Sequence, residues 1–113
     1  MTVTGENISM TRGDSETLTV SCDRPFVNGD VVEMTVRKTA TSDEEMYKRV
    51  EEFTLDGKAI IEINAEDTED MAFGSHLYDV QLTTYDGKVI TIIKPHTFYL
   101  DKEITYGRNT RES

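Results

Sequence analysis

The stretch Ser75–Lys94 reads Ser-His-Leu-Tyr-Asp-Val-Gln-Leu-Thr-Thr-Tyr-Asp-Gly-Lys-Val-Ile-Thr-Ile-Ile-Lys, and it decides the fold. Two runs rich in β-branched and aromatic residues flank the dipeptide Asp86-Gly87. Such runs favour strands, and an Asp-Gly pair between them is a strong local signal for an antiparallel hairpin. The sequence therefore predicts a hairpin here, and the other segments are interpreted around it.

The length of the hairpin loop decides which side chains face the core. A two-residue loop at Asp86-Gly87 pairs Val80 with Ile93, whereas a three-residue loop at 85–87, with a left-handed glycine, pairs Val80 with Ile92. A one-residue slip moves every side chain of a strand to the other face, so burial selects the register. We favour the three-residue loop, in which Val89 and Ile93 need cover on the far face and the following residues share the core face: Tyr78, Val80, Leu82, Ile90 and Ile92.

Alternation of apolar and polar residues recurs along the rest of the chain and is typical of half-buried strands. It marks residues 7–12, 16–22, 31–38 and 58–63, with a further strand at Thr97–Leu100. Pro95 before it cannot donate to a strand ladder, so it marks a strand end or an edge. The expected core side chains outside the hairpin are Ile8, Met10, Leu18, Val20, Cys22, Phe26, Val32, Met34, Val36, Ile61, Ile63, Phe98 and Leu100. This pattern predicts an all-β protein, an antiparallel β-sandwich of about seven to eight short strands.

Residues 45–54 fit two structures. Met46, Val50 and Phe53 are spaced for one face of a short amphipathic helix, and the neighbouring Lys and Glu residues are good helix formers. We favour a strand, because strands precede the segment and the dipeptide Asp56-Gly57 would close a hairpin with residues 58–63. The helix is the alternative.

One short helical turn is expected near residues 65–71. Asn64 is a suitable N-cap, and the acidic residues that follow it suit the positive end of a helix dipole. The turn should end before Gly74, with Met71 or Phe73 docked on the sandwich.

Length, charge and cysteine content limit the possible function. The 113 residues suffice for one domain, predicted as residues 1–104, with residues 105–113 as a C-terminal tail. A net charge of -10 disfavours nucleic acid and anionic membranes as partners. We see no signal peptide or membrane span, and the single cysteine, Cys22, is expected to be an inert core thiol in a protein made in a reducing cytoplasm.

The sequence shows no catalytic, cofactor-binding or metal-binding residues that we would assign. A zinc site would have to be assembled from Cys22, His76 and His96, which lack ligand spacing. A Ser-His-Asp triad would need Ser75, one of these histidines and Asp79, but Ser75 and His76 are neighbours in a predicted strand and point to opposite faces. We therefore expect no enzyme and no cofactor.

Two further patterns have simple structural readings. The acidic runs 43–45 and 66–70 lack the alternating ligands and central glycine of a calcium loop. A sugar-binding platform of tyrosines is not expected on a sandwich, where tyrosines are more often cross-strand packing partners; the tyrosines are Tyr47, Tyr78, Tyr85, Tyr99 and Tyr106. No internal repeat is recognised.

Four passages taken together resemble a known family. They are Ser9–Ser15, Glu33–Lys38, Ile61–Thr68 and Tyr78–Thr83, and in order and spacing they are similar to the immunoglobulin-like domain of structural proteins in tailed phages and prophages. The resemblance is to the N-terminal domain of phage baseplate upper proteins and covers about residues 8–106.

The resemblance implies an immunoglobulin-like sandwich that is a non-enzymatic virion component of a tail, baseplate or fibre attachment. Its partners would be other virion proteins or further copies of itself, reached through edge strands or residues 104–113. It would be made in the bacterial host cytoplasm and carried in the virion of a productive phage. Arg12-Gly13-Asp14 would be a turn between strands, and without a long receptor-facing region the chain would be a connector or accessory. The alternative is a stand-alone bacterial binding module for a carbohydrate or a surface protein.

Overall fold

The hairpin around Asp86-Gly87 forms the two longest strands of the structure, a computed structural model that describes residues 2–3 and 7–102. In the described residues the chain forms eight strands and one helix: β1 (Thr2–Val3), β2 (Ile8–Thr11), β3 (Glu16–Val20), β4 (Val31–Arg37), β5 (Glu44–Val50), β6 (Ala59–Ile63), α1 (Ala65–Thr68), β7 (Gly74–Thr83) and β8 (Val89–Asp101). The predicted tail, residues 105–113, lies outside the described part of the chain.

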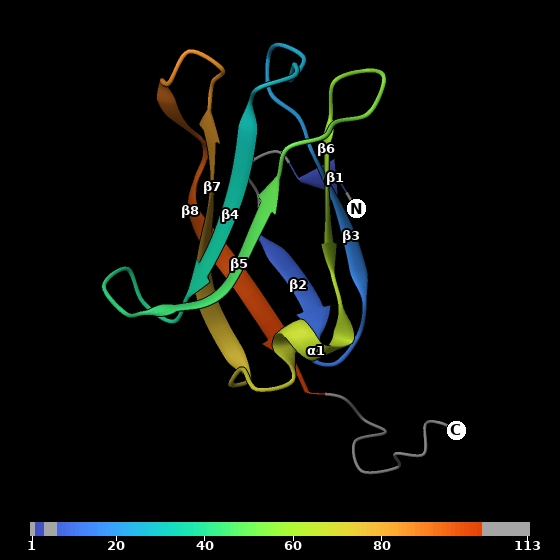
Figure 1. Ribbon diagram of the computed structural model, residues 1–113. Helices are drawn as coiled ribbons and strands as arrows, with labels where there is room; N and C mark the ends of the chain where they lie inside the picture. The colour runs from blue at the N-terminus through green and yellow to red at the C-terminus, as the bar shows by residue number, and fades with distance from the viewer. Residues whose placement is uncertain (1, 4–6, 103–113) are drawn as a thin grey trace.

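The strands form two facing sheets, and the predicted all-β sandwich is confirmed (Figure 1). Among the described residues one sheet has the order β2-β8-β7-β4-β5 and the other the order β1-β3-β6. The division of β3 and β6 from β8, β7 and β4 matches the immunoglobulin-like arrangement. No helix in these residues is long and apolar enough to cross a membrane.

The two N-terminal strands depart from the antiparallel pattern that we expected. β1 runs parallel to β3, and β2 runs parallel to β8, with Ile8 opposite Phe98 and Thr11 opposite Asp101. Parallel neighbours need a long connection between them, and for β2 and β8 that connection is almost the whole domain. Local sequence patterns cannot reveal such a pairing.

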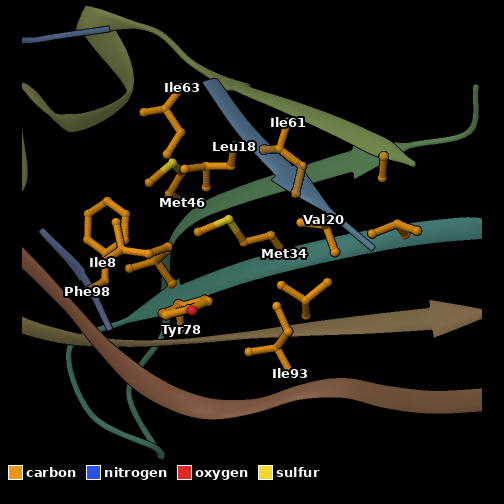
Figure 2. Close-up of a cluster of buried hydrophobic side chains, with 14 of the residues drawn as sticks. Ile8, Leu18, Val20, Met34, Met46, Ile61, Ile63, Tyr78, Ile93 and Phe98 are labelled. Atoms are coloured by element: carbon orange, nitrogen blue, oxygen red, sulfur yellow. The ribbon is translucent and has the colours of Figure 1, made fainter. Parts of the chain in front are cut away.

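The core lies between the sheets, where apolar side chains of both layers point toward one another (Figure 2). The alternation in β4 and β6 is reproduced residue by residue in burial, because each strand has one face on the core. The predicted core members outside the hairpin are confirmed, with Cys22 partly rather than fully buried.

The three-residue hairpin loop is confirmed, but the predicted register fails farther along the strands. Near the loop Leu82 pairs with Ile90, yet Val80 pairs with Ile93 rather than Ile92. The register shifts first between Gln81 and Val80, where Ile92 has no partner of its own in β7. It shifts again beyond Val80, where Lys94 and Pro95 together lie opposite Asp79, and each shift is an irregularity of the β-bulge type. The shift at Ile92 places Ile93 in the core at 2% exposure. The expected burial of Ile90 is wrong, since its side chain is 45% exposed, whereas Ile92 is partly buried and packs against the core.

Pro95 was expected to mark a strand end or a sheet edge. It does not end β8, but among the described residues β2 pairs with β8 only from Phe98 onward, so β8 is an edge strand at Pro95. β8 continues through it to Asp101. Proline lacks a backbone N–H, and in the bulge that missing donor falls where the ladder is already interrupted.

Residues 44–50 form a strand, so the preferred interpretation of this segment is confirmed. The hairpin expected between it and residues 58–63 is wrong, because β5 pairs with β4 whereas β6 pairs with β3 in the other sheet. The chain crosses between the sheets after Val50, and Phe53 packs against Phe26 with ring centroids 5.2 Å apart.

The short helix forms where Asn64 predicts it. The Asn64 N–H donates to the Asp67 carboxylate at 2.7 Å, which ties the first turn. Met71 is buried in the core, whereas Phe73 lies outside it. The Arg12 guanidinium lies over the Phe73 ring, with its Cζ 4.0 Å from the ring centroid. Arg12-Gly13 forms the turn between β2 and β3, and Gly13 N–H donates to the Thr68 hydroxyl.

Candidate functional site

His76, considered for both a zinc site and a triad, is a buried structural residue. Its Nδ1 lies 2.6 Å from a Glu45 carboxylate oxygen and its Nε2 lies 2.8 Å from the Ala72 carbonyl oxygen. Both ring nitrogens are thus occupied by β5 and by the segment before β7. The side chain is 1% exposed, so a ligand or substrate has no access to it.

The structure does not bring the other candidates to His76. Cys22 follows β3 and donates to the Arg24 carbonyl oxygen at 3.2 Å, whereas His76 lies on β7 in the other sheet. His96 contacts the Lys94 carbonyl oxygen at 2.6 Å. In the described residues, no group of three or more His, Cys, Asp or Glu side chains is placed to hold a metal ion.

Asp79 lies in a shallow hollow of about 110 Å³ on the outer face of the five-stranded sheet, next to the bulge at Pro95. Burial raises the pKa of its carboxyl, and the Arg37 charge partly offsets this rise. Neither Ser75 nor a histidine lines the hollow. The triad drawn from the sequence is therefore not assembled.

The acidic runs and the tyrosines are dispersed as well. The run 43–45 leads into β5, and Asp67 of the second run pairs with Lys48 at 2.6 Å. Tyr47 lies on β5 and Tyr99 on β8, with two strands between them, while Tyr78 is in the core. Tyr106 lies outside the described residues, and Tyr85 lies in the turn between β7 and β8.

The connections β3–β4, β5–β6 and β7–β8 gather at one end of the sandwich (Figure 1). We call their residues 23–30, 54–58 and 84–88 the loop end. Two of its turns, Thr54–Lys58 and Thr84–Lys88, share the sequence pattern Thr-X-Asp-Gly-Lys. The repeat is visible in the sequence, but the sequence analysis did not recognise it.

The two turns have the same hydrogen bonds. In each turn the Thr N–H donates to the Lys carbonyl oxygen, at 2.9 Å in 54–58 and 2.8 Å in 84–88, and the Gly N–H donates back to the Thr carbonyl oxygen at 2.9 Å. The Lys N–H donates to the Thr hydroxyl at 3.0 Å, and that hydroxyl donates to the Asp carboxylate. This last bond lowers the pKa of the Asp56 and Asp86 carboxyls, because it favours their charged form.

Asp30 joins the 23–30 loop to the 84–88 turn. Its buried carboxylate accepts the Tyr85 N–H at 3.0 Å through Oδ1, and the Val27 N–H at 3.0 Å and Arg24 Nη1 at 2.9 Å through Oδ2. Burial alone would raise the pKa of this carboxyl, but the hydrogen bonds and the Arg24 charge outweigh burial and hold it below its usual value.

The 54–58 turn is fixed to the other side of the same loop. The Phe26 N–H donates to the Gly57 carbonyl oxygen at 2.9 Å, and Gly57 packs so closely on Pro25 that an added Cβ would lie 2.4 Å from the proline Cβ. The 23–30 loop therefore lies between the two turns and holds both.

This ordered surface presents apolar side chains to solvent. Leu55 at the tip of one turn is 110% exposed, Tyr85 at the equivalent position of the other is 70% exposed, and Val27 between them is 45% exposed. Tyr85 borders a shallow hollow with Arg24, Val27 and Asn28. Such a surface can recognise a partner by contact.

Comparison of the chain with protein-family models and with curated protein sequences gave no match.

Proposed function

We propose that the protein is a non-enzymatic assembly component that contacts its partners through the loop end. The observation that carries this proposal is Leu55, a leucine entirely in solvent at the tip of a hydrogen-bonded turn. Its side chain contributes nothing to the core and exposes apolar area to water, which is unfavourable until a partner covers it.

The order of the loop end supports a role in binding. Ordering a loop on association costs free energy, and a surface that is already fixed avoids this cost. Here Asp30 and Gly57 tie all three loops together in the described structure. Binding residues are commonly placed on loops that a rigid scaffold positions.

We place the protein in the virion of a tailed phage or prophage on the strength of the family resemblance given above. A sandwich that exposes apolar side chains at its loop end is consistent with an accessory protein of a tail, baseplate or fibre attachment. Further virion proteins, or further copies of this chain, are then the partners.

The test uses particles released from an induced culture that carries the gene. We expect the chain to sediment with the particles, and a Leu55→Ser, Tyr85→Ser variant expressed in its place to stay in the supernatant. Tyr99→Ser is the matched control, since Tyr99 is a half-exposed tyrosine on β8 outside the loop end. Absence of the wild-type chain from the particles would refute the virion role, and sedimentation of the double variant would refute the loop end as the contact.

A carbohydrate- or surface-protein-binding module is the second candidate. The exposed Tyr85 ring beside Asn28 and Arg24 favours it, because an aromatic face next to amide and guanidinium donors suits a sugar. Glycan-array binding that Tyr85→Ser abolishes and Leu55→Ser leaves intact would favour this candidate over assembly.

A further inference from the structure

We infer that the loop end pairs with the loop end of a second copy of this chain, the 54–58 turn of each copy lying against the partner's 84–88 turn. This inference rests on the proposed function, since it names the partner of the same surface. It follows from the repetition of one turn on both sides of one loop.

The two turns are placed so that a twofold axis can exchange them. Gly57 packs on Pro25, whereas Tyr85 packs on Gly29 and bonds to Asp30, so the two turns flank the 23–30 loop. A twofold contact is made by the same patch on both copies, and each residue pair occurs twice. An axis through the 23–30 loop brings each turn onto the other turn of the second copy.

The chemistry of the turns is complementary in this arrangement. Leu55 meets the partner's Tyr85, so that both exposed tips are covered. Each turn carries an Asp and a Lys two residues apart, and the Asp56–Lys58 pair lies at 3.6 Å. With the turns antiparallel, Asp56 faces the partner's Lys88 and Lys58 faces the partner's Asp86.

The charge distribution also favours contact at this end. The loop end contains four acidic and three basic residues and so carries -1 of the net charge of -10. The rest of the chain carries the remaining -9, and contact through a nearly neutral patch adds little repulsion between the two copies.

The contact is small, and we expect a weak dimer. A standard interface uses roughly 20–30 residues on each side, more than the three short loops supply. The dimer should therefore form at high protein concentration and dissociate on dilution.

Light scattering and sedimentation over a wide concentration series test the inference on the full chain. We expect a monomer–dimer equilibrium that Leu55→Asp weakens by at least about tenfold, because the change acts twice in a symmetric contact. Tyr99→Ser should leave it unchanged. Leu55 has no packing role, so the variant should remain folded, which circular dichroism checks.

Crosslinking tests the exchange of turns directly. In a Cys22→Ala background, Leu55→Cys and Tyr85→Cys proteins are mixed with a bismaleimide, to which each thiol adds without any redox step. We expect the mixed product to exceed both single-variant products.

A chain that stays monomeric at every concentration would overturn the inference, while sedimentation with particles would still test docking to another protein. A dimer that Leu55→Asp leaves intact, or a preference for like-with-like crosslinks, would overturn it too.

Discussion

Asp30 shows how one side chain sets the geometry of the loop end. A buried carboxylate is costly unless hydrogen bonds and a counter-charge compensate it, and here two backbone N–H groups and Arg24 do so. Its hydrogen-bond partners come from the 23–30 loop and from the 84–88 turn, so the carboxylate fixes the position of the turn relative to the loop.

Asp30→Ala should destabilise the fold by about 2 kcal/mol, because it leaves two part-buried N–H donors without an acceptor and Arg24 without its counter-charge. Urea unfolding followed by circular dichroism measures the change. Arg24→Ala should cost less, since the Arg24 side chain is 40% exposed and its loss leaves both backbone hydrogen bonds in place. Equal losses in the two variants would contradict the role given to the backbone bonds.

The lowered pKa of Asp30 makes stability depend on pH in the acidic range. Because the pKa is lower in the folded than in the unfolded protein, its contribution is complete above the unfolded value and is lost as pH falls through the folded value. Urea midpoints measured from neutral to acidic pH should fall more steeply for the wild type than for Asp30→Ala. Parallel curves would contradict this assignment.

At the scale of the element, the two similar turns provide a matched pair of glycine substitutions. Gly87 and Gly57 both have a positive φ, 92° and 75°, which L-residues adopt at a cost of about 1–2 kcal/mol. An added Cβ at Gly87 meets nothing within 4 Å, whereas at Gly57 it would lie 2.4 Å from the Pro25 Cβ.

We expect Gly87→Ala to cost about 1 kcal/mol and Gly57→Ala roughly 2–4 kcal/mol, since only the latter must also displace the 23–30 loop. Thermal unfolding of both variants gives the comparison. If Gly87→Ala were the more damaging of the two, the close packing of the 54–58 turn on Pro25 would be wrong.

The register shift at Ile92 in β8 yields a second matched pair, Ile93 and Ile90. Ile93→Ala should destabilise the fold by about 2–5 kcal/mol, because it opens a cavity in the core. Ile90→Ala should cost less than about 1 kcal/mol, since the side chain is already half exposed. Chemical denaturation of the two variants tests the register, and a larger loss for Ile90→Ala than for Ile93→Ala would favour the unbulged pairing.

The elements that the sequence could predict are those coded by neighbouring residues. Alternation identified β2, β3, β4 and β6 with their core faces, Asn64 identified the helix, and Tyr85-Asp86-Gly87 identified the hairpin loop. The two-residue strand β1 was not predicted. The register shift at Ile92 could not be predicted, because Ile92 and Ile93 are equally apolar and only contact with the opposite sheet distinguishes them. The partner of β6 was missed for the same reason.

The candidate site too has one part that neighbouring residues predict and one part that only tertiary contacts determine. The repeated Thr-X-Asp-Gly-Lys pattern is visible in the sequence, but the gathering of both turns around residues 23–30 depends on strand pairing across two sheets. Asp30 gave no local signal, since its partner Tyr85 is 55 residues away.

For the whole molecule, the net charge of -10 predicts a salt-dependent stability. Like charges repel one another in the compact state, and salt screens them: the Debye length falls from about 10 Å at 0.1 M to about 3 Å at 1 M. The thermal midpoint should rise with sodium chloride and then level off. A midpoint that falls on adding salt would mean that attractive surface pairs outweigh the repulsion.

The parallel pairing of β2 with β8 has a mechanical consequence. Because the two strands run in the same direction, force applied before Ile8 and after Asp101 slides one strand along the other. All the backbone hydrogen bonds between the two strands then resist the force at the same time. Two further bonds share the load, Thr97 N–H to the Asn7 side chain and Arg12 N–H to Asp101. Single-molecule extension between residues 7 and 102 should need a higher rupture force than opening an antiparallel hairpin of the same length from its free end. In such a hairpin the hydrogen bonds between the strands break one after another. A domain tied in this way can transmit tension between two neighbours without unfolding.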